Sequence, residues 1–545
     1  MEEQFDYVII GAGAAGAILA NRLSEDADTT VCLLESGPPD RHPYLHIPAG
    51  FIKVLFDPAH TWQYSAEPTH WTHGRRIPLP QGRTLGGSTS INGLAYNRGQ
   101  PEDFDDWAQV AGNSGWDYAH VLPYFKRTEQ RLSGGDPRYR GTQGPLPVSD
   151  IEWIHPLCEA FIAGAQTLGI PRNPDYNGAT QEGVGYFQRT IKGRWRMSTA
   201  RTYLHPVRAR RNLEIRTEAT ATRIVFDGRR AGGVRYLRGA DGGPEREVRA
   251  RREVLVCTGA LSTPKLLQLS GIGDAPLLGK LGIPVLQHAP GVGRNLRDHI
   301  SIRFVARVHG IATINELSRA PRLWGQIANW LLGRPNMLAL SPSLVHWFTR
   351  SQPSVARPDL QGVFAPASYR EGYVGVLDTY PGMTAGVWQH RPYSNGTVAA
   401  ASPDPADKPL IQPNYLQDER DRATLIAGMR IARKLLQTTP LQRFGPVESL
   451  PGKDVQRDDE LLDFARRFAV SSYHVCGSAR MGRADDAQAV LDDQLRVRGV
   501  DALRVIDASA MPNVTSANTC AATMMIAEKA ADLIRGRAAP PPADL

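Results

Sequence analysis

The segment that most constrains the fold is residues 6–16, Asp-Tyr-Val-Ile-Ile-Gly-Ala-Gly-Ala-Ala-Gly. Its apolar part, residues 7–10, reads as a buried parallel strand that leads into the spacing G-x-G-x-x-G at Gly11, Gly13 and Gly16. The first glycine permits a tight turn, the second lets a pyrophosphate approach the backbone, and the third lets the next helix pack against the strand. The segment therefore predicts the start of a Rossmann-like unit.

The residues that follow support this prediction. Residues 14–23, which begin with Ala14 and Ala15, form a small-residue helix whose N-terminus offers free N–H groups to phosphates. A second strand at residues 30–34 ends in Glu35, which is placed to accept hydrogen bonds from both ribose hydroxyls. Because strand, helix and acid all stand at their expected positions, a dinucleotide site is favoured over a chance glycine turn.

Length and composition indicate a large globular protein. A chain of 545 residues is too long for one compact core, so we expect two domains or one elaborated domain. Its hydrophobic content of 41% and charged content of 22% are ordinary, and no long uncharged apolar run predicts a membrane span. The acidic N-terminus enters the first strand within a few residues, which leaves no room for a signal peptide and favours a cytoplasmic location.

Charge and cysteine content exclude several classes of function. The net charge of +8 contains no block of like charge, which argues against nucleic-acid binding and leaves weak attraction to the surface of the inner membrane open. The five cysteines show no C-x-x-C pairing, so we expect neither a disulfide framework nor a metal site. We expect the thiols of Cys32 and Cys257, which lie in apolar strand-like runs, to be buried.

The predicted fold class is α/β with α+β elements, and its parts are discontinuous in sequence. Segments 1–150, 200–298 and 469–537 are assigned to a nucleotide-binding domain, segments 151–199 and 299–468 to a substrate domain, and 538–545 to a disordered tail. The substrate domain is expected to hold a mostly antiparallel sheet flanked by helices. Expected strands are 212–217, 222–226, 232–236, 253–257, 382–388, 396–401 and 503–507; expected helices are 421–436, 458–468 and 521–535.

Four further segments resemble the signatures of the glucose–methanol–choline (GMC) oxidoreductase family. They are residues 82–92 (GRTLGGSTSIN), 259–273 (GALSTPKLLQLSGIG), 474–482 (HVCGSARMG) and 518–525 (NTCAATMM). The resemblance covers nearly the whole chain and is strongest to the bacterial choline- and alkanol-dehydrogenase-like members.

This resemblance implies FAD as the cofactor. The residues implied to bind it include Gly11, Gly13, Ala14, Ala15, Gly16, Glu35, Trp62, Gly86, Gly87, Asn92, Gly93, Leu94, Ala95, Ala221, Asp507, Ala508, Thr519 and Thr523. For Trp62 a place in the core stays open as the alternative. A tethering histidine or cysteine of the family is replaced by Ile91, which implies that the FAD is non-covalent.

The resemblance also implies the chemistry. His474 would take the hydroxyl proton of a primary alcohol, and Asn518 would donate a hydrogen bond to the substrate oxygen while a hydride passes to flavin N5. Asp298 and His299 resemble a family feature for which we expect a role in fixing a loop. Ser472 is small and polar where family oxidases tend to be apolar, which favours a dehydrogenase that passes electrons to a quinone or other carrier.

Three alternatives stay open. One is an alcohol oxidase of the same family that produces hydrogen peroxide, the second is a non-redox hydroxynitrile lyase, and the third is a non-catalytic FAD-binding protein. The substrate is expected to be an apolar or aromatic alcohol, on the hypothesis that aromatic residues between 300 and 470 line the pocket. These are Trp330, Trp347, Phe348, Trp388 and His390, with a place in the core as the alternative for each.

Overall fold

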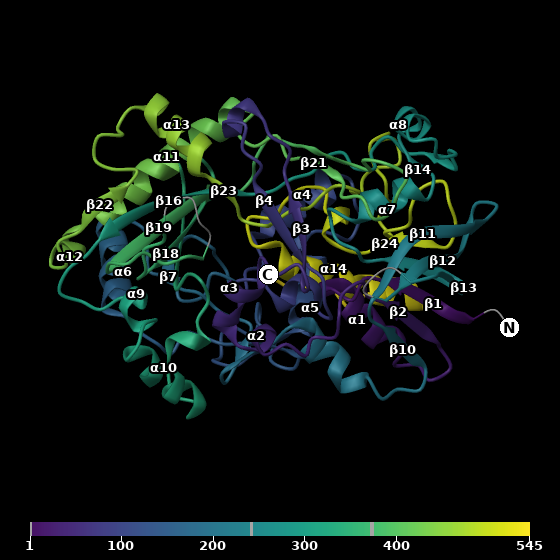
Figure 1. Ribbon diagram of the computed structural model, residues 1–545, viewed down its shortest axis with the longest axis horizontal. Coiled ribbons are helices and arrows are strands. Elements are labelled where there is room, and N and C mark those ends of the chain that lie inside the picture. Colours follow the sequence, from purple (N-terminus) through teal and green to yellow (C-terminus); the bar gives the residue numbers. More distant parts are fainter. Residues whose placement is uncertain (1–2, 240–242, 371–374) are drawn as a thin grey trace.

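Two seven-stranded sheets organise the protein in the computed structural model, which describes residues 3–239, 243–370 and 375–545 (Figure 1). One sheet is largely parallel and the other is antiparallel. The predicted α/β fold class with a Rossmann-like unit and an antiparallel second sheet is confirmed. Residues 1–2 of the first predicted segment lie outside the described residues.

The first sheet gathers strands from distant parts of the sequence in the order β10-β2-β1-β13-β12-β11, with β24 paired to β13. Its parallel strands are β1 (Gln4–Ile10), β2 (Val31–Leu34), β10 (Leu213–Arg216), β13 (Glu245–Val256) and β24 (Leu503–Val505). The hairpin β11 (Ala219–Asp227) and β12 (Arg230–Arg238) pairs with the first half of β13, so β24 pairs with the second half. The continuous apolar runs of β1 and β2 are buried, as strands covered on both faces require.

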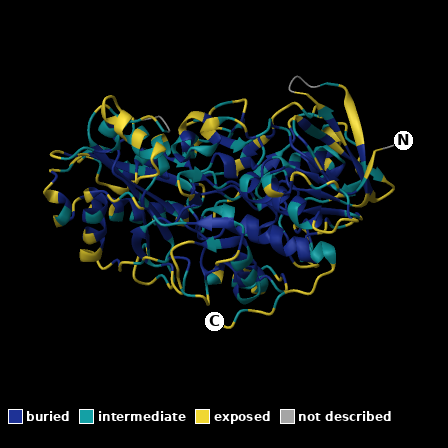
Figure 2. Cartoon of the chain, turned by 90° about the horizontal axis from the view of Figure 1, so that it is seen from below, coloured by how far each residue is buried: buried dark blue, intermediate teal, exposed yellow. Residues whose placement is uncertain are grey.

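Two helices pack together beside this sheet. They are α1 (Ala14–Leu23) and α14 (Thr519–Arg535), and α5 (Tyr118–Thr128) packs on α14. A Cβ atom built on Gly16 of α1 would lie 1.8 Å from the carbonyl oxygen of Gly11, so only glycine permits this close approach. Most of α14 is buried, and the buried residues run through the middle of the molecule while exposed ones lie at its periphery (Figure 2).

The second sheet is antiparallel, in the order β22-β16-β19-β18-β17-β7. Its strands are β22 (Val447–Leu450), β16 (Ile300–Arg307), β19 (Gly382–Gln389), β18 (Leu360–Ala365), β17 (Val345–Thr349) and β7 (Gly183–Tyr186), and β23 (Val470–Ser471) pairs with β16. Helices α6 (Pro156–Thr167), α11 (Glu419–Leu436) and α13 (Asp458–Phe468) flank it. The strand expected at 396–401 forms β20 (Thr397–Ala399), which pairs with β21 (Leu410–Gln412) outside this sheet.

The C-terminal tail packs against the rest of the protein. The structure places the tail against α5 in place of the expected disorder, since the N–H of Ala543 donates to the carbonyl of Ala119 over 2.9 Å.

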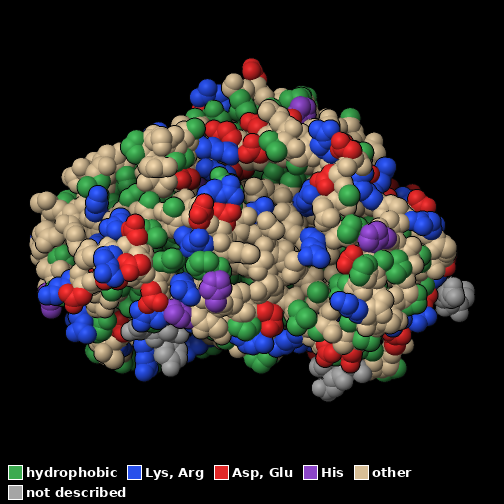
Figure 3. Space-filling view, turned by 90° about the horizontal axis from the view of Figure 1, so that it is seen from above, with side chains coloured by type: hydrophobic (Ala, Val, Ile, Leu, Met, Phe, Trp, Pro, Cys, Tyr) green, Lys and Arg blue, Asp and Glu red, His purple; other side chains and the backbone are tan. Residues whose placement is uncertain are grey.

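Across the described residues, no helix is long and apolar enough to cross a membrane and no cluster of ligands could hold a metal. Figure 3 shows basic and acidic side chains interspersed on one face. Cys32 and Cys257 are buried, as expected.

Candidate active site

The carboxyl ends of four parallel strands, β1, β2, β13 and β24, open on one cavity of about 460 Å³. Residues that directly follow the strands line it, among them Gly11 after β1, Glu35 after β2, Gly259 after β13 and Asp507 after β24. One face of β16, β18 and β19 forms the opposite wall. The cavity therefore lies where an open parallel sheet binds a nucleotide, and it continues to the antiparallel sheet.

Two glycine loops meet at the nucleotide end of the cavity. A Cβ atom built on Gly87 would lie 2.7 Å from the Cα of Gly13, and one built on Gly11 would lie 2.5 Å from the carbonyl oxygen of Cys257. The N-cap of α1, Gly13, has no side-chain cap, so backbone N–H groups at this helix end are free for a phosphate. This glycine cradle fits the pyrophosphate of FAD.

Glu35 is held in place before any nucleotide binds. Its two carboxylate oxygens accept hydrogen bonds from the backbone N–H groups of Ala12 (2.9 Å) and Gly37 (2.8 Å). Each oxygen keeps a lone pair for a ribose hydroxyl. Burial raises the pKa of Glu35 to about 7.

The catalytic loop that carries His474 is held by a buried carboxylate. One oxygen of Asp298 accepts the backbone N–H groups of His299 and His474, both over 2.8 Å. The other oxygen accepts the hydroxyls of Ser471 and Tyr415. These four bonds fix the loop against the start of β16, which is the loop-fixing role expected of Asp298.

Two imidazoles in direct contact define the protonation of His474. Nε2 of His299 lies 2.6 Å from the carbonyl oxygen of His390, so it must carry the proton and donate. Nδ1 of His299 is then an acceptor, and it lies 2.9 Å from Nδ1 of His474. The proton of His474 is therefore on Nδ1, and its lone pair is on Nε2.

Burial keeps both imidazoles neutral. It lowers the pKa of His299 to about 4, and burial together with His299 lowers the pKa of His474 well below its ordinary value of 6.5. His474 is thus neutral at neutral pH, and its Nε2 can accept a proton.

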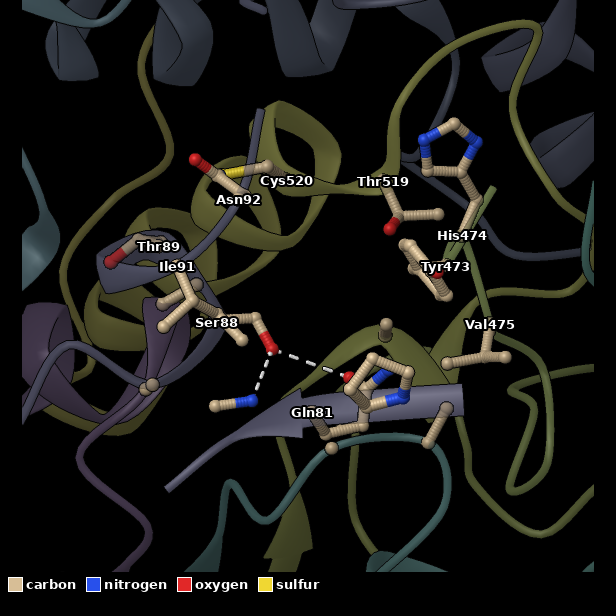
Figure 4. Close-up of a pocket in the computed structure, with 18 of the residues that line it drawn as sticks. Gln81, Ser88, Thr89, Ile91, Asn92, Tyr473, His474, Val475, Thr519 and Cys520 are labelled. Carbon is tan, nitrogen blue, oxygen red and sulfur yellow. Dashed lines mark hydrogen bonds between the residues drawn. The ribbon is translucent and has the colours of Figure 1, made fainter. Parts of the chain in front are cut away.

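Asn518 faces the lone pair of His474. Its side-chain nitrogen lies 2.8 Å from Nε2 of His474, and it can donate one N–H there and keep the second for another oxygen. Asn518 is the N-cap of α14, yet its side chain makes no capping bond and is directed to the cavity instead. In Figure 4, His474, Tyr473 and Thr519 lie to one side of the pocket, and Asn92, Ile91 and Cys520 lie to the other.

The loop around Asn92 is fixed by polar contacts. Oδ1 of Asn92 accepts the backbone N–H of Leu94 and the guanidinium of buried Arg196. The hydroxyl of Ser88 bonds to the backbone N–H of Gly82 over 3.0 Å and to Gln81 over 3.3 Å (Figure 4). These hydrogen bonds hold the loop that carries Ile91, whose apolar side chain lines the cavity.

Most of the predicted site residues lie at this cavity. Its lining includes Gly11, Gly13, Ala14, Ala15, Glu35, Trp62, Gly87, Asn92, Gly93, Leu94, Ala95, Ala221, His474, Asp507, Ala508, Asn518, Thr519 and Thr523. Gly16 and Gly86 are not in the lining, because Gly16 packs on Gly11 and the N–H of Gly86 donates to the carbonyl of Ala12. Trp62 is half-buried and lines the cavity, with the Arg83 guanidinium 4.9 Å from its ring centre.

The predicted aromatic lining is largely wrong. Trp388 lines the cavity, but Trp347 and Phe348 are buried in the core of the second sheet, on β17. His390 is buried outside the lining and contributes its backbone carbonyl to His299. Trp330 lies on the surface helix α10 (Arg322–Leu331). Arg303 and Gln361, which also line the cavity, were not identified from the sequence, because composition does not show which face of a strand a residue is on. Cys520 of α14, a further lining residue, was not identified either.

Comparison with known proteins agrees with this geometry. Two sequence profiles, both described as GMC oxidoreductase, match residues 5–301 and 392–527. Human mitochondrial choline dehydrogenase is 40% identical, over 98% of this chain and 91% of its own. The alcohol dehydrogenase (acceptor) of Pseudomonas putida is 38% identical, over 97% and 95%. The crystal structure of pyridoxine 4-oxidase from Mesorbium loti matches with a TM-score of 0.86 and 31% identity, over 98% of this chain and 100% of that one.

We expect the FAD to be released when the protein is precipitated with acid. Ile91 offers no nucleophile, and burial raises the pKa of the nearby Cys520 thiol to about 11, so that this thiol stays protonated. Absorbance of the supernatant and pellet measures the release, and Cys520→Ser, as the control, should behave like the parent. Flavin colour that stays in the pellet of both proteins would contradict the reading of Ile91.

Proposed function

Because this chain belongs to the GMC oxidoreductase family, we propose that it oxidises a primary alcohol to the aldehyde and passes the electrons to a quinone or another carrier. Action on CH–OH groups and the use of FAD follow from the family and from its choline and alcohol dehydrogenase relatives. The observation that carries the finer proposal is the hydrogen-bonded series His299–His474–Asn518, which ends at the cavity.

The protein's own side chains accept the proton and orient the substrate. FAD, when bound, accepts the hydride of the alcohol carbon. A substrate hydroxyl that replaces the Asn518 amide as the donor to Nε2 of His474 would lose its proton to Nε2. The second N–H of Asn518 would then stabilise the developing alkoxide, an effect typically worth about 3 kcal/mol.

We propose dehydrogenase activity over the rival activities because the side chain of Ser472, close to His474, is polar. Ser472 lines the cavity, and its hydroxyl has no hydrogen-bond partner in the described part of the chain. A polar position beside His474 supports an electron carrier over oxygen, as argued from the sequence. An oxidase would make hydrogen peroxide in air, and a lyase would not reduce its flavin with alcohol under anaerobic conditions.

One aromatic side chain of the cavity, Trp388, supports the proposal of an apolar or aromatic substrate. Of the aromatic residues expected in the pocket, Trp388 lines it. Its ring centre lies 5.9 Å from that of His474, so a substrate at the base would touch it.

Loss of His474 is the central test. His474→Ala should slow reduction of the flavin by alcohol by about a hundredfold or more, because the general base is removed. Asn518→Ala should also slow reduction but keep the pH dependence, since Asn518 does not titrate. Anaerobic rapid-mixing absorbance of FAD-loaded protein measures both. Equal rates for His474→Ala and the parent at every pH would refute the mechanism.

A second test addresses the positioning role of His299. The parent should reduce at a constant rate through neutrality and lose activity only as pH falls through the low pKa of His474, because protonated His474 cannot accept a proton. His299→Leu removes the acceptor for Nδ1, so the rate should fall, whereas the acid limb should stay well below neutrality because burial, the main cause of the low pKa, remains.

His299→Gln is the matched variant for this test. Its side-chain oxygen can still accept from Nδ1 of His474, so it should keep more of the rate than His299→Leu. Identical rates for the parent and His299→Leu across the pH range would show that the contact between the imidazoles has no effect on the base.

Peripheral binding to an anionic membrane, where a quinone would be reached, is supported by α10. Trp324 is 67% exposed on this helix, Leu331 is 60% exposed, and the exposed Arg322 and Arg334 flank them. Trp324→Ser should lower co-sedimentation with vesicles rich in anionic lipid, whereas Val110→Ser, at an exposed site on another helix end, should not. Equal sedimentation of the parent with neutral and anionic vesicles would count against selective binding to an anionic membrane.

A further inference from the structure

One face of the antiparallel sheet forms the wall of the cavity away from the nucleotide end. Side chains alternate along a strand, and Arg303 of β16 pairs with Gly386 of β19, which pairs with Val363 of β18. The side chains of this face are therefore those at every second position. They are Ser301 and Arg303 on β16, Thr384, Gly386 and Trp388 on β19, and Gln361, Val363 and Ala365 on β18.

Arg303 is the one formally charged residue among those of β16, β18 and β19 that line the cavity. Its guanidinium carbon lies 5.4 Å from the ring centre of Tyr369, and no described residue forms a hydrogen bond or ion pair with it. A Cβ atom built on Gly386 would lie 3.9 Å from Cγ of Arg303, so the neighbouring strand leaves room beside the arginine stem. The acidic residues of the cavity, Glu35 and Asp507, follow strands of the other sheet and already accept protein hydrogen bonds.

A second observation points to a ligand at the same wall. Gln361 is completely buried, and neither atom of its amide has a hydrogen-bond partner among the described residues. The indole N–H of Trp388, its cross-strand neighbour, likewise has no partner in the described chain. Trp388 lies two residues, or about 7 Å, along β19 from the partner of Arg303. Buried polar groups are normally paired, so these donors are suited to a polar group of a bound molecule.

We infer that the substrate is a hydroxy acid, whose carboxylate binds Arg303 with Gln361 and Trp388 while its hydroxymethyl group meets His474 and Asn518. This inference rests on the proposed function. One guanidinium matches the single negative charge of a carboxylate and its planar pair of oxygens. The hydroxymethyl group loses two electrons and two hydrogens to become the aldehyde, and the carboxylate is unchanged. A cationic alcohol such as choline would meet a like charge at this wall.

The first experiment compares substrates with the FAD-loaded protein and an artificial electron acceptor. The parent should have a higher kcat/KM for 4-(hydroxymethyl)benzoate than for benzyl alcohol, and the lowest value for choline. Arg303→Met should lower the ratio of the first two values by about ten- to hundredfold, the usual factor for a hydrogen bond to a charged group. Arg303→Lys should lower it less. A higher kcat/KM for choline, or an unchanged ratio in Arg303→Met, would overturn the inference.

Arg307 provides a matched control on the same strand and face. It is exposed, lies outside the cavity lining, and its guanidinium carbon is 4.0 Å from the ring centre of Tyr380. Arg307→Met removes the same charge and the same type of ring contact, so its substrate ratio should equal that of the parent. An equal fall of the ratio in Arg303→Met and Arg307→Met would overturn a role specific to Arg303.

The second experiment needs no turnover and separates this inference from the proposed function. Benzoate, which has no hydroxyl to oxidise, is titrated into the oxidised FAD protein while the flavin absorbance is followed. Benzoate should bind more tightly than benzamide, and Arg303→Met should raise its Kd about tenfold or more. Equal Kd values for benzoate and benzamide would overturn the inference even if alcohols are oxidised. Tighter binding of phenyl phosphate through Arg303 would replace the carboxylate by a phosphate.

Discussion

The contact between the imidazoles of His299 and His474 is the interaction on which the candidate site depends. It requires the start of β16, the loop after β23, the end of β19 and the start of α14 to meet at one place. Each of the four segments supplies one hydrogen-bonding group. The contacts of His299 with the carbonyl of His390 and with Nδ1 of His474 determine which nitrogen of His474 carries the proton, so the tautomer depends on segments that are distant in sequence.

Asp298 makes this arrangement possible at the cost of burying a carboxylate. Burial raises its pKa to about 6, although four donors stabilise the charged form. Two of the donors are backbone N–H groups of the histidines themselves. The carboxylate of Asp298 thus positions both His299 and His474, and this one buried group holds two segments together that are distant in sequence.

The sequence predicted the parts of the fold whose signals are local. The glycine spacing at residues 11–16 and the acid at Glu35 need only neighbours along the chain, and the strands and helices that flank them were found close to their observed bounds. Helix α13 (Asp458–Phe468) was found because its apolar residues repeat along one face. Asn518 and His474 were identified through the family resemblance, and their separation of 2.8 Å could not be read from a spacing of 44 residues.

What the sequence could not provide was the face on which each strand residue lies. Trp347 and Trp388 are both aromatic residues of apolar strands, yet one is buried in the core and the other lines the cavity. The difference depends on the cross-strand register, which a shift of one residue would reverse. Reduced pKa values of the histidines are hidden for a similar reason, since desolvation depends on what surrounds the group in space.

The charge inside the cavity also could not be predicted from the sequence, and it affects which substrates can bind. Basic and acidic side chains are interspersed on the face that Figure 3 shows, where solvent and salt screen them, and the net charge of +8 carries no information about the pocket. A single guanidinium, which has no ionic partner among the residues that the structure describes, acts where screening is weak, on a wall whose other lining side chains are neutral. Relatives named for choline are 40% and 41% identical to this chain, and a cationic substrate would be repelled by a wall that carries a positive charge. The sign of that wall here is set by Arg303, so the family determines the chemistry at His474 and the sheet face determines which alcohols can reach it.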